Sequence, residues 1–131
     1  MKRKRLSWNA YLKMIADLGV MIQKDKAAHF DHILAINRGG NIIGTILSHT
    51  LDIPLTIITA TQELKGYKNV LLCDEISDTG LTLKRVALHL NEAKINYKVA
   101  TLHMKPDTQY TPDFCISTIK EWIVYPYERE D

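Results

Sequence analysis

Apolar residues occur along this chain in two patterns, continuous runs and helical spacing, and the two patterns alternate. Short continuous apolar runs predict buried strands, and apolar positions three to four residues apart predict helices. Because strands and helices alternate through the middle of the chain, we expect an α/β fold whose sheet is mainly parallel and is flanked by helices. The runs that predict strands are His32–Ile36, Leu55–Thr59, Val70–Cys73 and Tyr97–His103.

Helical spacing is found in three stretches. The first has Ser7 as its N-cap and ends in the polar segment 23–26. The second covers Ile42–Leu51, with Asn41 as its cap, and the third begins at Leu81. The first helix is expected to pack on the sheet through one apolar stripe, which consists of Trp8, Leu12, Ile15, Leu18 and Ile22.

One connection between strands is unusually short. Only ten residues, ATQELKGYKN, separate the strand that ends at Thr59 from the strand that begins at Val70. This segment is too short for a crossover helix and barely long enough to return to the start of the next strand. We therefore expect a connection without a helix.

The sequence VLLCDEISDTGLT, residues 70–82, places an acidic pair and a small polar loop between a strand and a helix. A loop that opens a helix presents unpaired backbone N–H groups, which bind anions such as phosphate. Gly80 would let a ligand approach the backbone closely. Asp74 and Glu75 would repel a bare phosphate, so the pattern favours a ligand with both phosphate and hydroxyl groups, or a bound magnesium ion. The alternative is an ordinary βα turn with a solvated acidic pair.

A second candidate loop, Arg38, Gly39 and Gly40, follows the strand His32–Ile36. Adjacent glycines free the backbone to bind an anion, and a guanidinium suits paired phosphate oxygens. By itself an RGG sequence is equally compatible with a tight turn. Its place adds weight, because ligands of open α/β sheets sit outside the carboxyl ends of the strands. Two such loops on adjacent strands would form one site.

The composition is that of one globular domain, with 131 residues, 46% hydrophobic and 24% charged, and a formal net charge of +2. No apolar run approaches the length of a membrane span. Cys73 and Cys115 lie inside predicted strands rather than in a metal-ligand spacing, so we interpret them as reduced, buried thiols of a cytoplasmic protein with no membrane partner. The basic cluster at residues 2–5 is short and lacks interleaved aromatic residues. We interpret it as a solvated terminus rather than a nucleic-acid contact.

Residues 70–82 resemble the signature of the type I phosphoribosyltransferases, in which a hydrophobic strand runs into two acidic residues and a DTG-x-T loop. The resemblance implies the type I phosphoribosyltransferase fold and the binding of phosphoribosyl pyrophosphate with Mg²⁺ as cofactor. It implies that Asp74 and Glu75 hold the ribose hydroxyls, and that Arg38, Gly39 and Gly40 hold the pyrophosphate. The loop implied to hold the 5′-phosphate consists of Ser77, Asp78, Thr79, Gly80, Leu81 and Thr82.

Two further segments resemble the purine-specific members of that family. The segment LHMKPDTQYTPDF matches their KP…PD stretch, which implies that Lys105 contacts the purine 6-oxygen. The segment EWIVYPYE resembles their C-terminal hood, which implies that Trp122 stacks on the base and that Ile123 offers backbone contacts to its edge. Without the resemblance, Lys105 would be interpreted as a surface lysine and Trp122 as a core residue. The hood also supplies Glu128, a carboxylate near the base or metal.

The resemblance implies a single domain over residues 1–131, with a core at about 28–104 and a hood at about 105–131, to which the N-terminus is a candidate contributor. The implied reaction, a step of purine salvage, transfers ribose 5-phosphate from phosphoribosyl pyrophosphate to a 6-oxopurine base. Asp78 lies where the family places a general base near purine N7, so the candidate catalytic residues are Asp78, Asp74 and Glu75. The candidate metal ligands are Asp74, Glu75 and Glu128.

The sequence departs from the family in the ten-residue connection, where most members carry a long flexible loop that closes over the substrate. Its near absence implies either weak turnover or a neighbouring subunit that covers the site. We expect a homodimer or homotetramer. A non-catalytic regulatory protein that binds phosphoribosyl pyrophosphate or a nucleotide is the alternative function. Lys105 argues against a third possibility, transfer to adenine or a pyrimidine, because its donor suits a 6-oxo group.

Overall fold

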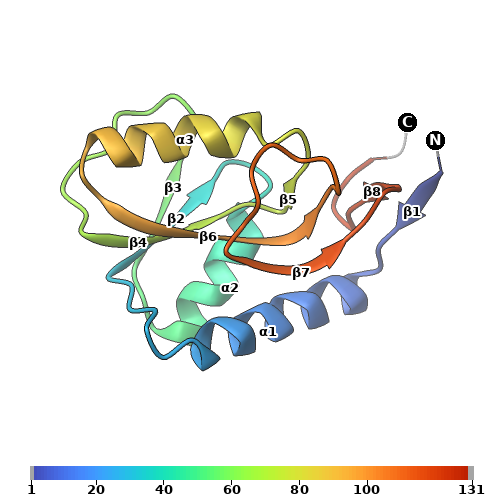
Figure 1. Ribbon diagram of the computed structural model, residues 1–131. Helices are drawn as coiled ribbons and strands as arrows, with labels where there is room; N and C mark the ends of the chain where they lie inside the picture. Colours follow the sequence, from blue (N-terminus) through green and yellow to red (C-terminus); the bar gives the residue numbers. More distant parts are fainter. Residues whose placement is uncertain (1, 130–131) are drawn as a thin grey trace.

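The computed structural model describes residues 2–129, which form one main sheet with helices on both faces and a small second sheet (Figure 1). Helix α3 covers one face of the main sheet, and helices α1 and α2 cover the other. The expected α/β class with a mainly parallel sheet is confirmed. In chain order the elements are β1 (Arg3–Arg5), α1 (Trp8–Lys24), β2 (His32–Ile36), α2 (Asn41–Leu51), β3 (Leu55–Ile58), β4 (Asn69–Cys73), β5 (Ile76–Ser77), α3 (Leu81–Glu92), β6 (Asn96–Met104), β7 (Phe114–Thr118) and β8 (Trp122–Val124).

All strand pairs of the main sheet are parallel, in the order β3-β2-β4-β6-β5, and β7 pairs with β6 as well. Strands β4 and β5 follow β6 in one register, since Cys73 lies opposite Ala100 and Ile76 lies opposite His103. The acidic pair, residues 74–75, therefore occupies a short break between two paired segments. This break turns the pair out of the sheet at the end of its central strand.

The two faces of the main sheet carry separate apolar clusters. The cluster below α1 and α2 contains Tyr11 and Leu47, and the cluster below α3 contains Leu83 and Leu90. Leu64, from the ten-residue connection, is buried in the cluster on the α3 side. The connection has no helix, as expected, yet it covers part of the sheet by burying this leucine.

The expected apolar stripe of α1 is only partly right. Its last three members are buried, but Trp8 and Leu12 are 48% and 44% exposed. Tyr11 takes the inward position at the start of the helix and is fully buried. The reason is the helical period of 3.6 residues, which brings Tyr11 rather than Leu12 onto the face of the later buried residues.

The N-cap predicted from the sequence is right for α1 and wrong for α2. Ser7 is the N-cap of α1, as predicted, and its side chain accepts a hydrogen bond from the Ala10 N–H at 3.1 Å. The prediction that Asn41 caps α2 is wrong, because Gly40 is the cap and Asn41 is the first helical residue. The Asn41 side chain instead donates to Asn37 Oδ1 at 2.8 Å.

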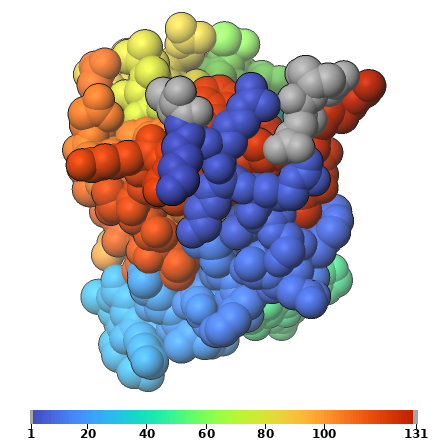
Figure 2. Space-filling model, turned by 90° about the vertical axis from the view of Figure 1, so that its right-hand side faces the viewer, coloured from blue at the N-terminus to red at the C-terminus, as the bar shows by residue number. Residues whose placement is uncertain are grey.

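The two ends of the described chain meet in the second sheet, where β1 and β8 pair in parallel. Arg3 lies opposite Trp122, and Arg5 lies opposite Val124. The side chains of the basic cluster are exposed, but its backbone is part of a strand rather than of a solvated terminus. Figure 2 shows this N-terminal segment lying between segments of the C-terminal tail. Phe114–Thr118 falls in the range expected for the hood, but it pairs with β6 in the main sheet.

Both cysteines are free thiols, and only one has the expected environment. Cys73 is fully buried, whereas Cys115 is half-buried. Within residues 2–129, no helix is both long enough and apolar enough to span a membrane.

Candidate active site

The predicted site residues gather where β2, β4 and β5 end. The first loop, Asn37–Gly40, follows β2, and the acidic pair follows β4, its direct neighbour in the sheet. The two loops therefore meet at one edge, as the sequence predicted. This edge is where open parallel sheets bind their ligands.

The loop after β2 packs against the acidic pair so closely that it needs glycine. A Cβ on Gly39 would lie 2.5 Å from the Glu75 carboxyl carbon, and a Cβ on Gly40 would lie 2.4 Å from the Cys73 carbonyl oxygen. The peptide bond between Asn37 and Arg38 is cis. Arg38 is exposed beside this contact, and its positive charge lowers the pKa of Glu75.

Burial dominates the electrostatics of the acidic pair. It raises the pKa of Asp74 to about 7, although a hydrogen bond from the Glu75 backbone N–H to Asp74 Oδ1, at 2.8 Å, acts in the opposite direction. Burial also raises the pKa of Glu75, while a hydrogen bond from the Tyr127 hydroxyl lowers it. Two carboxylates held together in this way favour a cation or hydroxyl donors as ligands.

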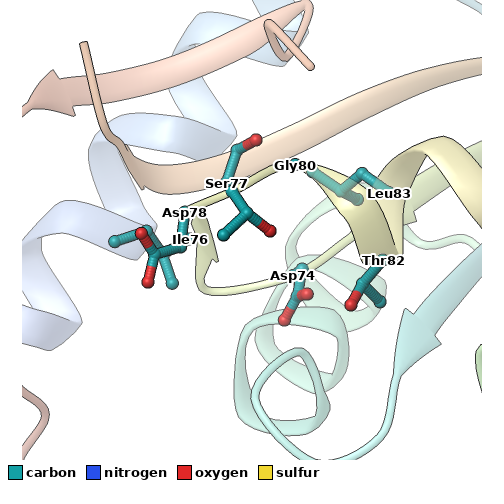
Figure 3. Close-up of a pocket in the computed structure, with 8 residues that line it drawn as sticks. Asp74, Ile76, Ser77, Asp78, Gly80, Thr82 and Leu83 are labelled. Carbon is teal, nitrogen blue, oxygen red and sulfur yellow. The ribbon is translucent and has the colours of Figure 1, made fainter. Parts of the chain in front are cut away.

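A cavity of about 80 Å³ lies between Asp74 and the first turn of α3, and Figure 3 shows its lining. Gly80 begins the helix with a φ of 87° and supplies no side-chain cap. The Thr79 hydroxyl accepts from the Leu81 N–H at 3.2 Å. Backbone N–H groups at the start of a helix bind anions. The lining residues are Asp74, Ile76, Ser77, Asp78, Thr79, Gly80, Thr82 and Leu83.

Residues 108–110, which follow β6, pack against the loop at residues 77–80 and hold it in place. A Cβ on Gly80 would lie 2.6 Å from the Tyr110 backbone nitrogen, and the Gln109 N–H donates to the Thr79 carbonyl at 2.9 Å. The Ser77 hydroxyl takes part in the same contact, because it bonds the Thr108 hydroxyl at 2.8 Å and the Tyr110 carbonyl at 2.6 Å. In the described structure this hydroxyl is therefore committed to protein partners. Any contact of Ser77 with a phosphate would come from its backbone.

A second cavity, of about 450 Å³, begins on the other side of Asp78 and is also lined by Lys105 and Lys120. Lys105 is buried, and its ammonium donates to the backbone carbonyls of Lys120 at 3.2 Å and Glu121 at 2.6 Å. These bonds tie the lysine to the start of β8. An ammonium has three N–H donors, so one donor is left for a ligand in the cavity.

The hood residues Trp122 and Ile123 directly follow Lys120 and Glu121, whose carbonyls hold Lys105, but they differ in exposure. Trp122 is 51% exposed, so it is not the core residue that its spacing alone would favour. Ile123 is buried and pairs with Lys4 of β1. The aromatic face of Trp122 is thus free to contact a flat ligand, whereas Ile123 can contribute only through its backbone.

A third cavity, of about 610 Å³, contains Arg38, Gly39, Glu75 and Glu128 in its lining. Glu128 Oε1 accepts from the Tyr125 N–H at 2.9 Å, so one of its oxygens is already used. Within the described residues, no three His, Cys, Asp or Glu side chains are grouped closely enough to hold a metal ion by themselves. The carboxylates present suit Mg²⁺, which binds through one or two carboxylates, waters and substrate phosphates.

Two tail tyrosines belong to the site and were not predicted. The Tyr127 hydroxyl donates to the Glu75 carboxylate, and the Tyr125 hydroxyl donates to the Glu75 carbonyl oxygen at 3.3 Å. The only signal in the sequence is the aromatic run YPY in the tail. That run gives no indication of a partner in the acidic pair.

A scan against models of protein families matches residues 59–129 to the phosphoribosyl transferase domain. The chain belongs to this family. The match includes the acidic pair, the phosphate loop and the tail, whereas the loop Arg38–Gly40 lies before it. The resemblance noted in the sequence is confirmed.

Individual relatives support the assignment to this family of enzymes. The phosphoribosyltransferase domain is 31% identical to a purine phosphoribosyltransferase from Pyrococcus horikoshii, with a TM-score of 0.87 over 100% of this chain and 97% of that one. It is 29% identical to a xanthine-guanine phosphoribosyltransferase from Desulfotalea psychrophila, over 77% of this chain and 72% of the relative. It shares the fold of a xanthine-guanine-hypoxanthine phosphoribosyltransferase from Helicobacter pylori, with a TM-score of 0.82 and 22% identity over 94% of this chain and 90% of that one.

Proposed function

We propose that this phosphoribosyltransferase transfers ribose 5-phosphate from phosphoribosyl pyrophosphate to a 6-oxopurine base and releases pyrophosphate. The observation that carries the proposal is that the three cavities lie next to one another around the acidic pair and Asp78. Asp78 lines both the phosphate-loop cavity and the Lys105 cavity, whereas Asp74 lines the phosphate-loop cavity and its neighbour Glu75 lines the Arg38 cavity. In this proposal, one ligand with a 5′-phosphate, a ribose and a pyrophosphate extends from the first cavity past the acidic pair to the third, while a base enters the second.

Each part of the site has a separate task in this reaction. Displacement at the sugar carbon passes through a cation-like state, so the protein acts mainly by positioning and electrostatic stabilisation. The first turn of α3 would hold the 5′-phosphate, and Arg38 with Gly39 and Gly40 would hold the pyrophosphate. Asp74 and Glu75 would hold the ribose hydroxyls, and Asp78 would take the proton from the attacking purine.

Magnesium is part of the proposal because of the donors that the site offers. Glu75 and Glu128 line the cavity proposed for the pyrophosphate, and Asp74 lines the neighbouring phosphate-loop cavity, so each supplies carboxylate oxygens for the ion. When bound with the substrate, the ion would neutralise charge on the leaving pyrophosphate. The acidic pair would orient the ribose in either case, through hydrogen bonds to its hydroxyls.

Lys105 supports a 6-oxopurine in particular. Two of its three donors are used by the carbonyls of Lys120 and Glu121, and the remaining donor suits an oxygen rather than an amino group. The relatives described above, which are named for xanthine, guanine and hypoxanthine, support the same class of base. Trp122 would stack on the base from the hood.

The direct test is turnover with phosphoribosyl pyrophosphate and Mg²⁺ against guanine, xanthine, hypoxanthine and adenine, with nucleotide formation as the readout. We expect product with at least one oxopurine and none with adenine. Product with adenine would contradict the role of Lys105. Binding of phosphoribosyl pyrophosphate without product from any base would instead favour a regulatory protein, which the ten-residue connection also favours because it leaves no room for a closing loop.

A further inference from the structure

Tyr127 contacts the acidic pair from the C-terminal tail, and its ring is held by other aromatic residues. The ring stacks on that of Tyr125, with centroids 5.9 Å apart and an angle of 9° between the planes. The Tyr11 ring packs edge-on against the Tyr127 ring, with centroids 5.6 Å apart, and the centroid of the Trp8 ring lies 6.3 Å from that of Tyr127. Two of these neighbours come from α1. The position of the Tyr127 hydroxyl is thus fixed by packing between the tail and the first helix.

That hydroxyl donates to Glu75 Oε2, and Glu75 is confined on its other side as well. The backbone of Gly39 leaves no room there, since even a Cβ would lie 2.6 Å from Glu75 Oε1. The Glu75 carbonyl is held by the Tyr125 hydroxyl at 3.3 Å. These contacts restrain the carboxylate on both sides before any substrate arrives. A carboxylate accepts about four hydrogen bonds in all, so the bond from Tyr127 leaves most of its capacity for a ligand.

The Tyr11 hydroxyl is a second polar group buried near Tyr127 and Glu75. Tyr11 is fully buried, and its hydroxyl has no hydrogen-bond partner of ordinary geometry within the described residues. Burial raises the pKa of Tyr11 to about 12, and the nearby Tyr127 hydroxyl partly opposes this effect. The Tyr11 ring lies against the Tyr127 ring, with centroids 5.6 Å apart. A buried hydroxyl without a good partner is costly. This destabilising hydroxyl lies where α1, the C-terminal tail and the acidic pair meet.

We propose that Tyr127 is a positioning residue that fixes the Glu75 carboxylate to receive a ribose hydroxyl of the substrate. The inference rests on the proposed function, because it assigns the ribose to the acidic pair. Without the phenol bond, the Glu75 side chain would be free to rotate, and ordering it would weaken substrate binding. The effect is confined to ligands that carry the ribose hydroxyls.

The test compares GMP with 2′,3′-dideoxyguanosine 5′-monophosphate, each with Mg²⁺, by calorimetric titration. The proteins are the wild type, Tyr127→Phe and Tyr67→Phe. Tyr127→Phe keeps the stacked ring and removes only the hydroxyl. Tyr67→Phe removes a phenol hydroxyl next to His32, at the opposite ends of the strands, and is the matched control.

We expect Tyr127→Phe to weaken GMP about tenfold, the loss of one charge-assisted hydrogen bond, and to leave the dideoxy nucleotide within about twofold of wild type. Tyr67→Phe should bind both as the wild type does. In a Glu75→Gln background, adding Tyr127→Phe should cause little further loss, because the two side chains act as one unit.

The outcomes separate this inference from the proposed function. If the wild type binds neither nucleotide, or does not distinguish them, the assignment of the ribose to the acidic pair fails. If the wild type distinguishes them and Tyr127→Phe does so equally well, only the role of Tyr127 is overturned. Equal weakening of both nucleotides would show a merely structural residue. Tighter binding of GMP by Tyr127→Phe would show that the phenol competes with the ribose, which also overturns the proposal.

Discussion

Asp74 and Glu75 are adjacent in the chain but are supported by different parts of the fold. Asp74 accepts its hydrogen bond from the next backbone N–H, so its geometry is local. Glu75 is held between Gly39 and Tyr127, which lie far apart in the sequence. The sequence identifies both carboxylates through the DTG-x-T motif. It cannot identify the supports of Glu75, because these depend on how the tail folds back.

Asp74→Asn tests the electrostatic cost of the pair in the metal-free protein. The pKa of Asp74 is about 7 in the folded protein, against an ordinary value of 3.8. The folded state therefore binds the proton more tightly, and stability is lost as the pH rises from about 4 to about 7. Asparagine does not ionise. At pH 8 we expect the variant to be more stable to urea than wild type by up to about 4 kcal/mol, with no gain at pH 4.

The control for this measurement is Asp78→Asn, at an exposed position in the loop that follows β5, which should change stability little at either pH. His103 is buried with its pKa lowered to about 4, and its titration affects all the proteins alike. A gain that is equal at pH 4 and pH 8 would show that burial of the Asp74 charge is not its cause.

Asp78→Asn also tests the candidate general base. Asp78 is exposed and lies between the phosphate-loop cavity and the Lys105 cavity. Removing a general base lowers turnover by about 10²- to 10⁴-fold, whereas binding of phosphoribosyl pyrophosphate should change much less. Steady-state kinetics and direct titration of phosphoribosyl pyrophosphate would measure the two effects separately. An equal loss of both would remove the assignment.

Lys105 and Ser77 show what residue patterns can and cannot reveal about side-chain direction. Both were identified from motifs, and both lie at the predicted edge of the sheet. The Lys105 ammonium remains in the cavity because two hood carbonyls hold it there. The Ser77 hydroxyl is bound to Thr108 and Tyr110 instead. The sequence gives the residue type and the loop, but side-chain direction follows from distant packing partners.

At the scale of elements, the strands with continuous apolar runs were predictable and the short ones were not. The runs beginning at His32, Val70 and Tyr97 form the centre of the main sheet, where burial on both faces requires such a pattern. Strands β1 and β5 lack it. Strand β1 is a run of basic residues, and only its pairing with β8 makes it a strand.

The pairing of β1 with β8 predicts a role for the N-terminal residues in base binding. Strand β1 supports Trp122 and Ile123 through register pairs, and the Trp122 N–H donates to the Lys2 carbonyl at 2.9 Å. A variant that begins at Leu6 should keep its affinity for phosphoribosyl pyrophosphate. Its KM for the purine should rise, by about tenfold if roughly 1.4 kcal/mol of ordering is lost.

The matched control is the full-length chain with Lys2 and Lys4 changed to glutamine, which keeps the strand backbone and removes two charges. If this control loses base binding to the same extent as the truncated chain, charge rather than the strand supports the hood. Unchanged kinetics in the truncated chain would show that β8 does not need its partner strand.

For the whole molecule, the main consequence of the fold is an open site. The connection between β3 and β4 buries Leu64 and contributes no closing loop over the cavities. Loops of that kind keep water from reactive intermediates. We therefore expect measurable release of ribose 5-phosphate from phosphoribosyl pyrophosphate and Mg²⁺ when no base is present.

This hydrolysis should fall when a 6-oxopurine is added, because the base occupies the cavity beside Lys105. Undetectable hydrolysis, together with normal transfer, would mean that something covers the site. A second subunit is then the first candidate, and light scattering of the enzyme in solution would reveal it.

Cys73 ends the strand that leads into the acidic pair and is fully buried, with a pKa raised by burial and by Asp74. Its thiol can therefore react with an alkylating reagent only when this part of the sheet opens. Cys115, which is half-buried, provides an internal reference in the same chain. The rate of alkylation at Cys73 therefore reports how often the end of β4, next to the acidic pair, opens. Substrates that stabilise this part of the sheet should slow the alkylation, and the measurement needs no added label.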